Sequence, residues 1–176
     1  MSERRLFFAL EPPPQVRDQI ARIKQLCAVD NRGRAVTEAN LHLTLQFLGC
    51  IPEEQIAPLT VAAESLAAAP FELSLECFGH WKEPRVLWMG PQITPVPLLA
   101  LQLGVENALE KRCAIKPEAK AYRPHVTLMR KLKVVESLPQ MEPILWRVEQ
   151  FSLMESISTV DGVVYKALKQ WKLQAV

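Results

Sequence analysis

The chain has 176 residues, of which 49% are hydrophobic and 23% charged, as expected for one domain with a packed core. Its formal net charge of +2 is too small for a protein that coats long nucleic acid through phosphate contacts, but it leaves room for a local basic patch around a short anionic ligand. The four cysteines form no C-x-x-C pair, which argues against a zinc site and predicts reduced thiols in a cytoplasmic protein.

The first half of the chain predicts a strand, a helix and a second strand. The apolar run at residues 6–10 is too short for a signal peptide or a membrane span, so we expect a buried strand there. An amphipathic helix follows Pro14, and its apolar face carries Val16, Ile20, Ile23 and Cys27. Residues 40–48 alternate between polar and apolar side chains up to Gly49, which predicts a half-buried strand.

The rest of the chain predicts two more helices and several strands. Residues 52–69 are rich in alanine, and Pro58 requires this helix to start late or to kink. Residues 95–113 predict an amphipathic helix, in which Leu98, Leu101, Val105, Ala108 and Arg112 recur at helical spacing. Strands are expected at residues 71–77, 86–89, 125–129, 144–154 and 163–173, with a turn at Asp161-Gly162 before the last.

The order of strand, proline-led helix and His-x-Thr strand occurs twice in the chain. The two motif histidines, His42 and His125, are 83 residues apart (125 − 42 = 83), close to half the length of the chain. We therefore expect a single domain, residues 1–176, made of two similar lobes that face each other about a pseudo-two-fold axis. This arrangement would place the two histidines on opposite walls of one groove.

Each motif combines a polar face with an apolar face. Because alternate residues of a strand point to the same side, His42 and Thr44 share one face, and His125 and Thr127 share another. One His-x-Thr sequence would carry little weight, since a strand histidine is often satisfied by a neighbouring hydroxyl. Two such motifs in matched apolar contexts indicate a site.

These four side chains suit the hydrolysis of a cyclic phosphodiester. The reaction needs a base that deprotonates water and an acid that protonates the leaving oxygen, and histidine can do either near neutral pH. Threonine hydroxyls can hold the non-bridging oxygens of the phosphate. The chemistry requires no metal and no cofactor, and we predict neither.

The paired motifs resemble those of the two-histidine (2H) phosphoesterases, most closely the RNA 2′,3′-cyclic phosphodiesterases that are historically called 2′-5′ RNA ligases. The resemblance spans nearly the whole chain. Besides the motifs it rests on the segments 5–9, 47–49 and 122–124 and on Arg130, Tyr165, Leu168 and Trp171. One departure lies at Asp161–Val164, where relatives often carry arginines, and it weakens the expectation of RNA contacts from this turn.

The resemblance implies a LigT-like α+β fold in which two antiparallel sheets flank a central groove and the helices lie outside. It implies that His42 is the proton donor and that His125 is the proton acceptor that activates water. The expected product is a 2′-phosphomonoester, with the proton delivered to the 3′ oxygen. Some members of the family also carry out a reversible ligation that joins ends through a 2′-5′ bond.

Three further residues are candidates for substrate binding. Arg130 could reach a phosphate or form a surface ion pair, and strict alternation turns it away from His125 unless the strand contains a bulge or ends there. Tyr122 could stack on a base or pack in the core, and Arg123 flanks the same motif.

The sequence thus predicts a cytoplasmic, monomeric enzyme that acts on RNA ends or nucleotides with a 2′,3′-cyclic phosphate, with no membrane contact and no obligate protein partner. Three alternatives remain at this point. The chain could bind nucleotides or RNA ends without turnover, it could act on small nucleotides alone, or it could be a structural protein in which both motifs are incidental.

Overall fold

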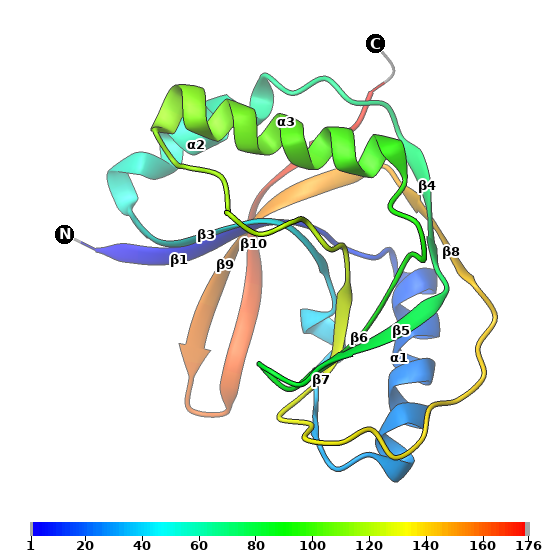
Figure 1. Ribbon diagram of the computed structural model, residues 1–176. Coiled ribbons are helices and arrows are strands. Elements are labelled where there is room, and N and C mark those ends of the chain that lie inside the picture. Colours follow the sequence, from blue (N-terminus) through cyan, green and yellow to red (C-terminus); the bar gives the residue numbers. More distant parts are fainter. Residues whose placement is uncertain (1, 175–176) are drawn as a thin grey trace.

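A curved antiparallel sheet dominates the structure, a computed structural model that describes residues 2–174 (Figure 1). The strand order along it is β10-β9-β1-β3-β7-β6-β5, and the short β2 pairs with β7. A separate two-stranded sheet joins β4 and β8. The strands are β1 (Glu3–Leu10), β2 (Arg34–Ala35), β3 (Leu43–Pro52), β4 (Phe71–Leu75), β5 (Cys77–Trp81), β6 (Val86–Gly90), β7 (Val126–Arg130), β8 (Ile144–Val148), β9 (Gln150–Thr159) and β10 (Gly162–Lys172).

Within residues 2–174, three α-helices cover the sheets. They are α1 (Pro14–Asp30), α2 (Ile56–Glu64) and α3 (Val96–Cys113), and two 3₁₀ turns, Glu38–Asn40 and Glu53–Gln55, complete the structure. In Figure 1, α2 and α3 lie together above the end of the sheet that contains β1, β3 and β9, while α1 lies near β7 and β8. The α+β class predicted from the sequence is confirmed. None of the helices described is both long and apolar enough to cross a membrane.

The two repeated units each contain an antiparallel pair of strands with a helix between them in the chain. These units are β1–α1–β3 and β6–α3–β7. The units meet where β3 pairs with β7, at the single residue pair Leu43 and Val126. The two expected sheets are therefore joined at one point and diverge on either side of it. The division into two lobes of one domain stays a prediction.

The two faces of the sheet have different roles. Leu6, Phe8 and Leu10 of β1 are fully buried in the main core under the helices. Phe7 and Ala9 point to the opposite face, where they form a small cluster with Met154. This second face carries the motif side chains and is called the groove face below.

Several predicted boundaries are wrong. The strand predicted from residue 40 begins at Leu43, because residues 38–40 form a 3₁₀ turn in which Leu41 N donates to Glu38 O at 3.2 Å. The strand predicted at 125–129 begins at Val126, so each motif histidine directly precedes its strand. The helix predicted at 52–69 starts at Ile56, which places Pro58 in the first turn, where no intrahelical N–H bond is lost.

Two predicted strands are each divided between the sheets. Residues 71–77 belong to β4 and the start of β5, and residues 144–154 belong to β8 and β9. The apolar alternation continues through the first crossing, so the pattern there contains no sign of the change of sheet. At the second crossing the consecutive polar residues Glu149 and Gln150 shift the alternation by one residue. In α3, Leu109 rather than Arg112 ends the buried stripe, and Gln102 is buried within it.

Candidate functional site

The pairing of Leu43 with Val126 brings the two motifs together. In an antiparallel pair this register sets His42 opposite Thr127 and Thr44 opposite His125. Both paired residues are fully buried, so the four motif side chains alternate to the other side of the sheet. The structure therefore collects the four predicted catalytic residues on the groove face.

A β-bulge follows each motif. Ala9 pairs with Thr44 but Phe8 pairs with Gln46, which makes Leu45 an extra residue of β3. As a result, Leu45 and Gln46 are both buried, at 2% and 4% exposure, and Phe47 returns to the groove face. The bulge thus shifts the alternation of β3 by one residue.

The same shift occurs in β7. Trp88 pairs with Thr127 but Leu87 pairs with Met129, so Leu128 is the extra residue. Arg130, five residues after His125, consequently points to the same face as the motif. For Arg130 to share a face with His125, the sequence required a bulge or a strand end, and β7 contains this bulge.

Arg130 is also close enough to influence both histidines. Its positive charge lowers the pKa of His42 and of His125, although burial is the larger cause in each case. A guanidinium beside two imidazoles is well placed to meet a phosphate. Phosphate binding by Arg130 stays a prediction.

Backbone carbonyls orient both imidazole rings. His42 Nδ1 lies 2.7 Å from Asn40 O, and His125 Nδ1 lies 2.7 Å from Arg123 O. A carbonyl can only accept, so each Nδ1 donates and each Nε2 is left for chemistry. His42 Nε2 lies 3.1 Å from the Thr44 hydroxyl, which can donate to it.

Aromatic rings surround each histidine. The ring centroids of Phe7 and Tyr165 both lie 4.9 Å from that of His42. The ring centroids of Trp81 and Trp88 lie 4.6 and 6.1 Å from that of His125. These rings exclude water, and burial lowers the pKa of His42 to about 4 and lowers the pKa of His125 as well. Both histidines are therefore neutral at pH 7 in the unliganded protein.

Asn40 links His42 to strand β10. Its Nδ2 donates to Val163 O at 2.6 Å, and its Oδ1 accepts from Tyr165 N at 3.1 Å. The backbone carbonyl of the same residue accepts the Nδ1 proton of His42, while the Tyr165 ring meets His42 edge-on at 89°. Asn40 thus fixes the position of the histidine and of one aromatic neighbour at once.

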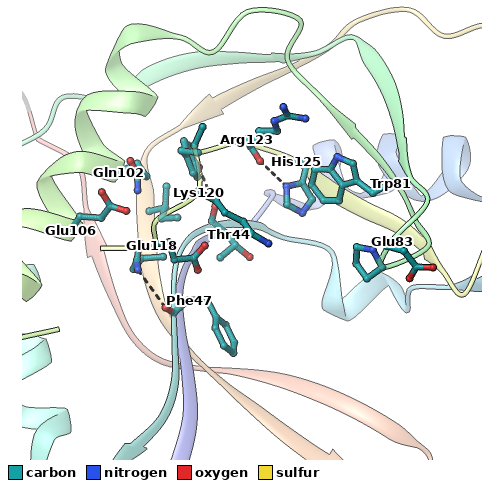
Figure 2. Close-up of a pocket in the computed structure, with 15 residues that line it drawn as sticks. Thr44, Phe47, Trp81, Glu83, Gln102, Glu106, Glu118, Lys120, Arg123 and His125 are labelled. Atoms are coloured by element: carbon teal, nitrogen blue, oxygen red, sulfur yellow. Dashed lines mark hydrogen bonds between the residues drawn. The ribbon is translucent and has the colours of Figure 1, made fainter. Parts of the chain in front are cut away.

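A cleft of about 680 Å³ opens beside the motifs (Figure 2). Thr44 and His125 line it, and from there it extends between β3, α3 and residues 118–123. His42, Thr127 and Arg130 are not among its lining residues, so the cleft adjoins the groove face without enclosing the whole site.

The other two predicted substrate contacts lie at this cleft. Arg123 is exposed at its edge, and Tyr122 is partly buried in its wall. The Tyr122 hydroxyl donates to Thr44 O at 3.0 Å, which supports the backbone of the first motif. Contact of either side chain with substrate stays a prediction.

Sequence reasoning missed several residues of the site. Asn40 was expected as an ordinary strand residue, and Trp81, which ends β5 beside His125, was not among the predicted site residues. Phe7 was expected in the core, yet it lies against His42. The position of Phe7 on the groove face could have been predicted, because Phe8 is buried and neighbouring residues of a strand point to opposite faces. Within residues 2–174, no cluster of three or more His, Cys, Asp or Glu side chains has the arrangement of a metal site.

Comparison with known proteins agrees with this geometry. A family model described as "LigT like Phosphoesterase" matches residues 10–88. The RNA 2′,3′-cyclic phosphodiesterase of Escherichia coli is 32% identical over 98% of this chain and 99% of the relative. The enzyme of the same name from Thermus thermophilus is also 32% identical, over 97% of this chain and 90% of the relative.

Solved structures give the same result. The crystal structure of Escherichia coli LigT with 3′-AMP superimposes with a TM-score of 0.91, at 29% identity, and covers 99% of this chain and 100% of that one. The structure of the same protein with ATP gives a TM-score of 0.88 at the same identity and coverage.

Proposed function

Because the chain belongs to the LigT-like phosphoesterase family, we propose that it hydrolyses RNA 2′,3′-cyclic phosphate ends to 2′-phosphomonoesters. The observation that carries the proposal is the crossed register of the two motifs, in which each histidine lies opposite the threonine of the other unit. An anion between the motifs would meet two imidazoles and two hydroxyls.

The proposed reaction assigns one direction of proton transfer to each ring. His125 Nε2 accepts a proton from water, which attacks phosphorus in line with the bond to the 3′ oxygen. His42 Nε2 donates a proton to that oxygen as the bond breaks. Thr44, Thr127 and Arg130 hold the non-bridging oxygens. Water thus supplies the new P–O bond, and the products are a 2′-phosphate and a 3′-hydroxyl.

His42 must be protonated before it can act as the acid. Its pKa of about 4 in the unliganded protein works against this, since burial and the Arg130 charge both favour the neutral ring. A bound phosphodiester carries a negative charge that opposes both influences and raises the pKa of His42. In this mechanism the bound substrate therefore favours the protonated form of His42, which acts as the acid.

The remaining features are part of the same proposal. The chain acts as a single domain, residues 1–176, and as a monomer in the cytoplasm, and the chemistry proceeds without a metal. Ligation of ends through a 2′-5′ bond would use the same proton transfers, with the 5′-hydroxyl of a second RNA end in place of water as the nucleophile and the 3′ oxygen again as the leaving group. Escherichia coli LigT, whose crystal structures were determined in complex with 3′-AMP and with ATP, supports a nucleotide ligand.

The test is the turnover of a short RNA with a 2′,3′-cyclic phosphate end, in the presence of EDTA, with the product identified by ³¹P NMR. We expect a 2′-phosphate as the product. A 3′-phosphate as the product would mean that the 2′ oxygen, and not the 3′ oxygen, is the leaving group. Loss of activity in EDTA would contradict metal independence. Binding without turnover would identify a binding module. Equal rates on the RNA end and on a cyclic mononucleotide would favour a phosphoesterase for small nucleotides.

A further inference from the structure

Helix α3 presents two polar side chains to the cleft. Gln102 and Glu106 are four residues apart, so they lie on one face of the helix, and both line the cleft (Figure 2). Gln102 is only 3% exposed and interrupts an apolar stripe that includes Leu101 and Val105. The Gln102 amide lines the cleft and is not one of the buried side-chain groups of residues 2–174 that lack a hydrogen-bond partner, so it is accessible to an occupant of the cleft.

A second buried amide faces the cleft from the opposite side. Because Gln46 pairs with Phe8, it shares the face of that core residue and points toward α3. Its Nε2 donates a long 3.4 Å bond to Phe47 O, and the Gln102 amide takes part in none of the side-chain hydrogen bonds of residues 2–174. Both amides therefore keep hydrogen-bonding capacity for an occupant of the cleft.

The position of the two amides suits a base attached to the reacting phosphate. Gln46 follows Thr44 by two residues, and the bulge at Leu45 turns its side chain to the core face, yet both residues line the same cleft. The cleft therefore reaches from the groove face to the core side of β3. The cleft is continuous from Thr44 and His125 to Gln102, and its volume of about 680 Å³ lies in the range of small-molecule pockets.

The chemistry of the lining indicates which bases fit. Glu106 and Glu118 both line the cleft, and ionised carboxylates can only accept hydrogen bonds. An exocyclic amino group supplies the donor that these acceptors need, whereas the O4 of uracil would place an acceptor against an acceptor. The glutamine amides can match either a donor or an acceptor on the rest of the base edge.

We propose that this cleft binds the base of the terminal nucleotide and selects bases with an exocyclic amino group, in particular cytosine over uracil. The selection rests on the proposed function, because it places the cyclic phosphate at the two motifs. Lys120 and Arg123 at the same cleft supply positive charge for the RNA backbone.

The test compares cytidine and uridine 2′,3′-cyclic phosphates, which differ at the amino group and in the adjacent ring nitrogen. We expect kcat/KM for the cytidine compound to be about 10-fold higher, the effect of one hydrogen bond to a charged group. Glu106→Gln should bring the ratio close to one, whereas Gln102→Leu should lower kcat/KM for both compounds and leave the ratio nearly unchanged. Glu110→Gln, one turn further along α3 and outside the cleft lining, is the matched control and should keep the wild-type ratio. Equal rates in the wild-type protein would overturn the proposal.

Product binding separates this inference from the proposed function. Calorimetry with cytidine and uridine 2′-monophosphates should show the same preference, and Glu106→Gln should remove it. Selective binding without turnover of either cyclic compound would leave the base site standing and refute the proposed function. Turnover of both compounds with equal binding of both products would leave the function standing and refute the base site.

Discussion

His42 lies between Phe7 and Tyr165 on the β1–β3 side of the groove, whereas His125 lies against Trp81 and Trp88 on the β5–β7 side. The backbone plan is the same in both places. Each histidine directly precedes a strand, donates from Nδ1 to the carbonyl two residues earlier, and is followed by a bulge.

The differences concern how firmly each ring is held. Asn40 accepts from His42 and also bonds to two backbone groups of β10. Arg123, its counterpart before His125, is exposed at the cleft. Five residues after each histidine the pair is Phe47 and Arg130, an aromatic ring in one unit and a cation in the other. Similar units can thus give one tightly fixed histidine outside the cleft lining and one histidine that lines the cleft, which suits an acid and a base with separate tasks.

The largest expected effect tests whether both histidines are needed. His42→Ala and His125→Ala should each lower turnover of a 2′,3′-cyclic phosphate by about 10²-fold or more, because a positioned acid or base contributes this much. Steady-state kinetics, with circular dichroism to check folding, measures the effect. A folded variant with a near-normal rate would remove that histidine from the mechanism.

The next effect tests the difference between Asn40 and Arg123. Asn40→Ala should lower kcat by roughly 10-fold, because the side chain that joins the 38–40 turn to β10 is lost, so the retained carbonyl of residue 40 and the Tyr165 ring hold His42 less firmly. Arg123→Ala keeps the carbonyl that orients His125 and should change kcat by less than about 3-fold. The opposite order of effects would mean that Asn40 does not position His42.

The features of this comparison that depend only on residues close together in the chain could be predicted from the sequence. The faces of His42, Thr44, His125 and Thr127 follow from alternation over a few residues, and so do the buried strand at Leu6–Leu10 and the two long helices. The bulges at Leu45 and Leu128 could not be predicted, because they depend on pairing with β1 and β6. The Asn40 bonds to β10 join residues that are 123 and 125 positions apart, and no local pattern encodes them.

A smaller effect separates Arg130 from Phe47. Arg130→Gln should raise KM for a cyclic nucleotide by about 10-fold, since one charge-assisted contact with phosphate is lost. Phe47→Leu keeps an apolar side chain at the equivalent position and should change KM by less than about 3-fold. Equal effects in the two variants would show that the bulge in β7 does not place Arg130 in contact with the phosphate.

The smallest effect concerns acid stability. The pKa of His42 is about 4 in the folded protein and about 6.5 when unfolded, so the unfolded chain binds more protons between these values and stability falls as pH falls through this window. Between pH 7 and pH 5.5 this loss should be about 1 kcal/mol of unfolding free energy. Urea unfolding of His42→Gln at both pH values should show a loss smaller by this amount. An unchanged loss would mean that His42 is not buried in its neutral form.

The central claim is that His42 and His125 act together on a single phosphate, and the double variant tests it most directly. If the two rings serve one step, kcat of His42→Ala/His125→Ala should be close to that of the more impaired single variant, because removing either ring already disables the concerted transfer. A decrease equal to the product of the two single effects, about 10⁴-fold or more, would mean that the histidines act independently and would contradict the account.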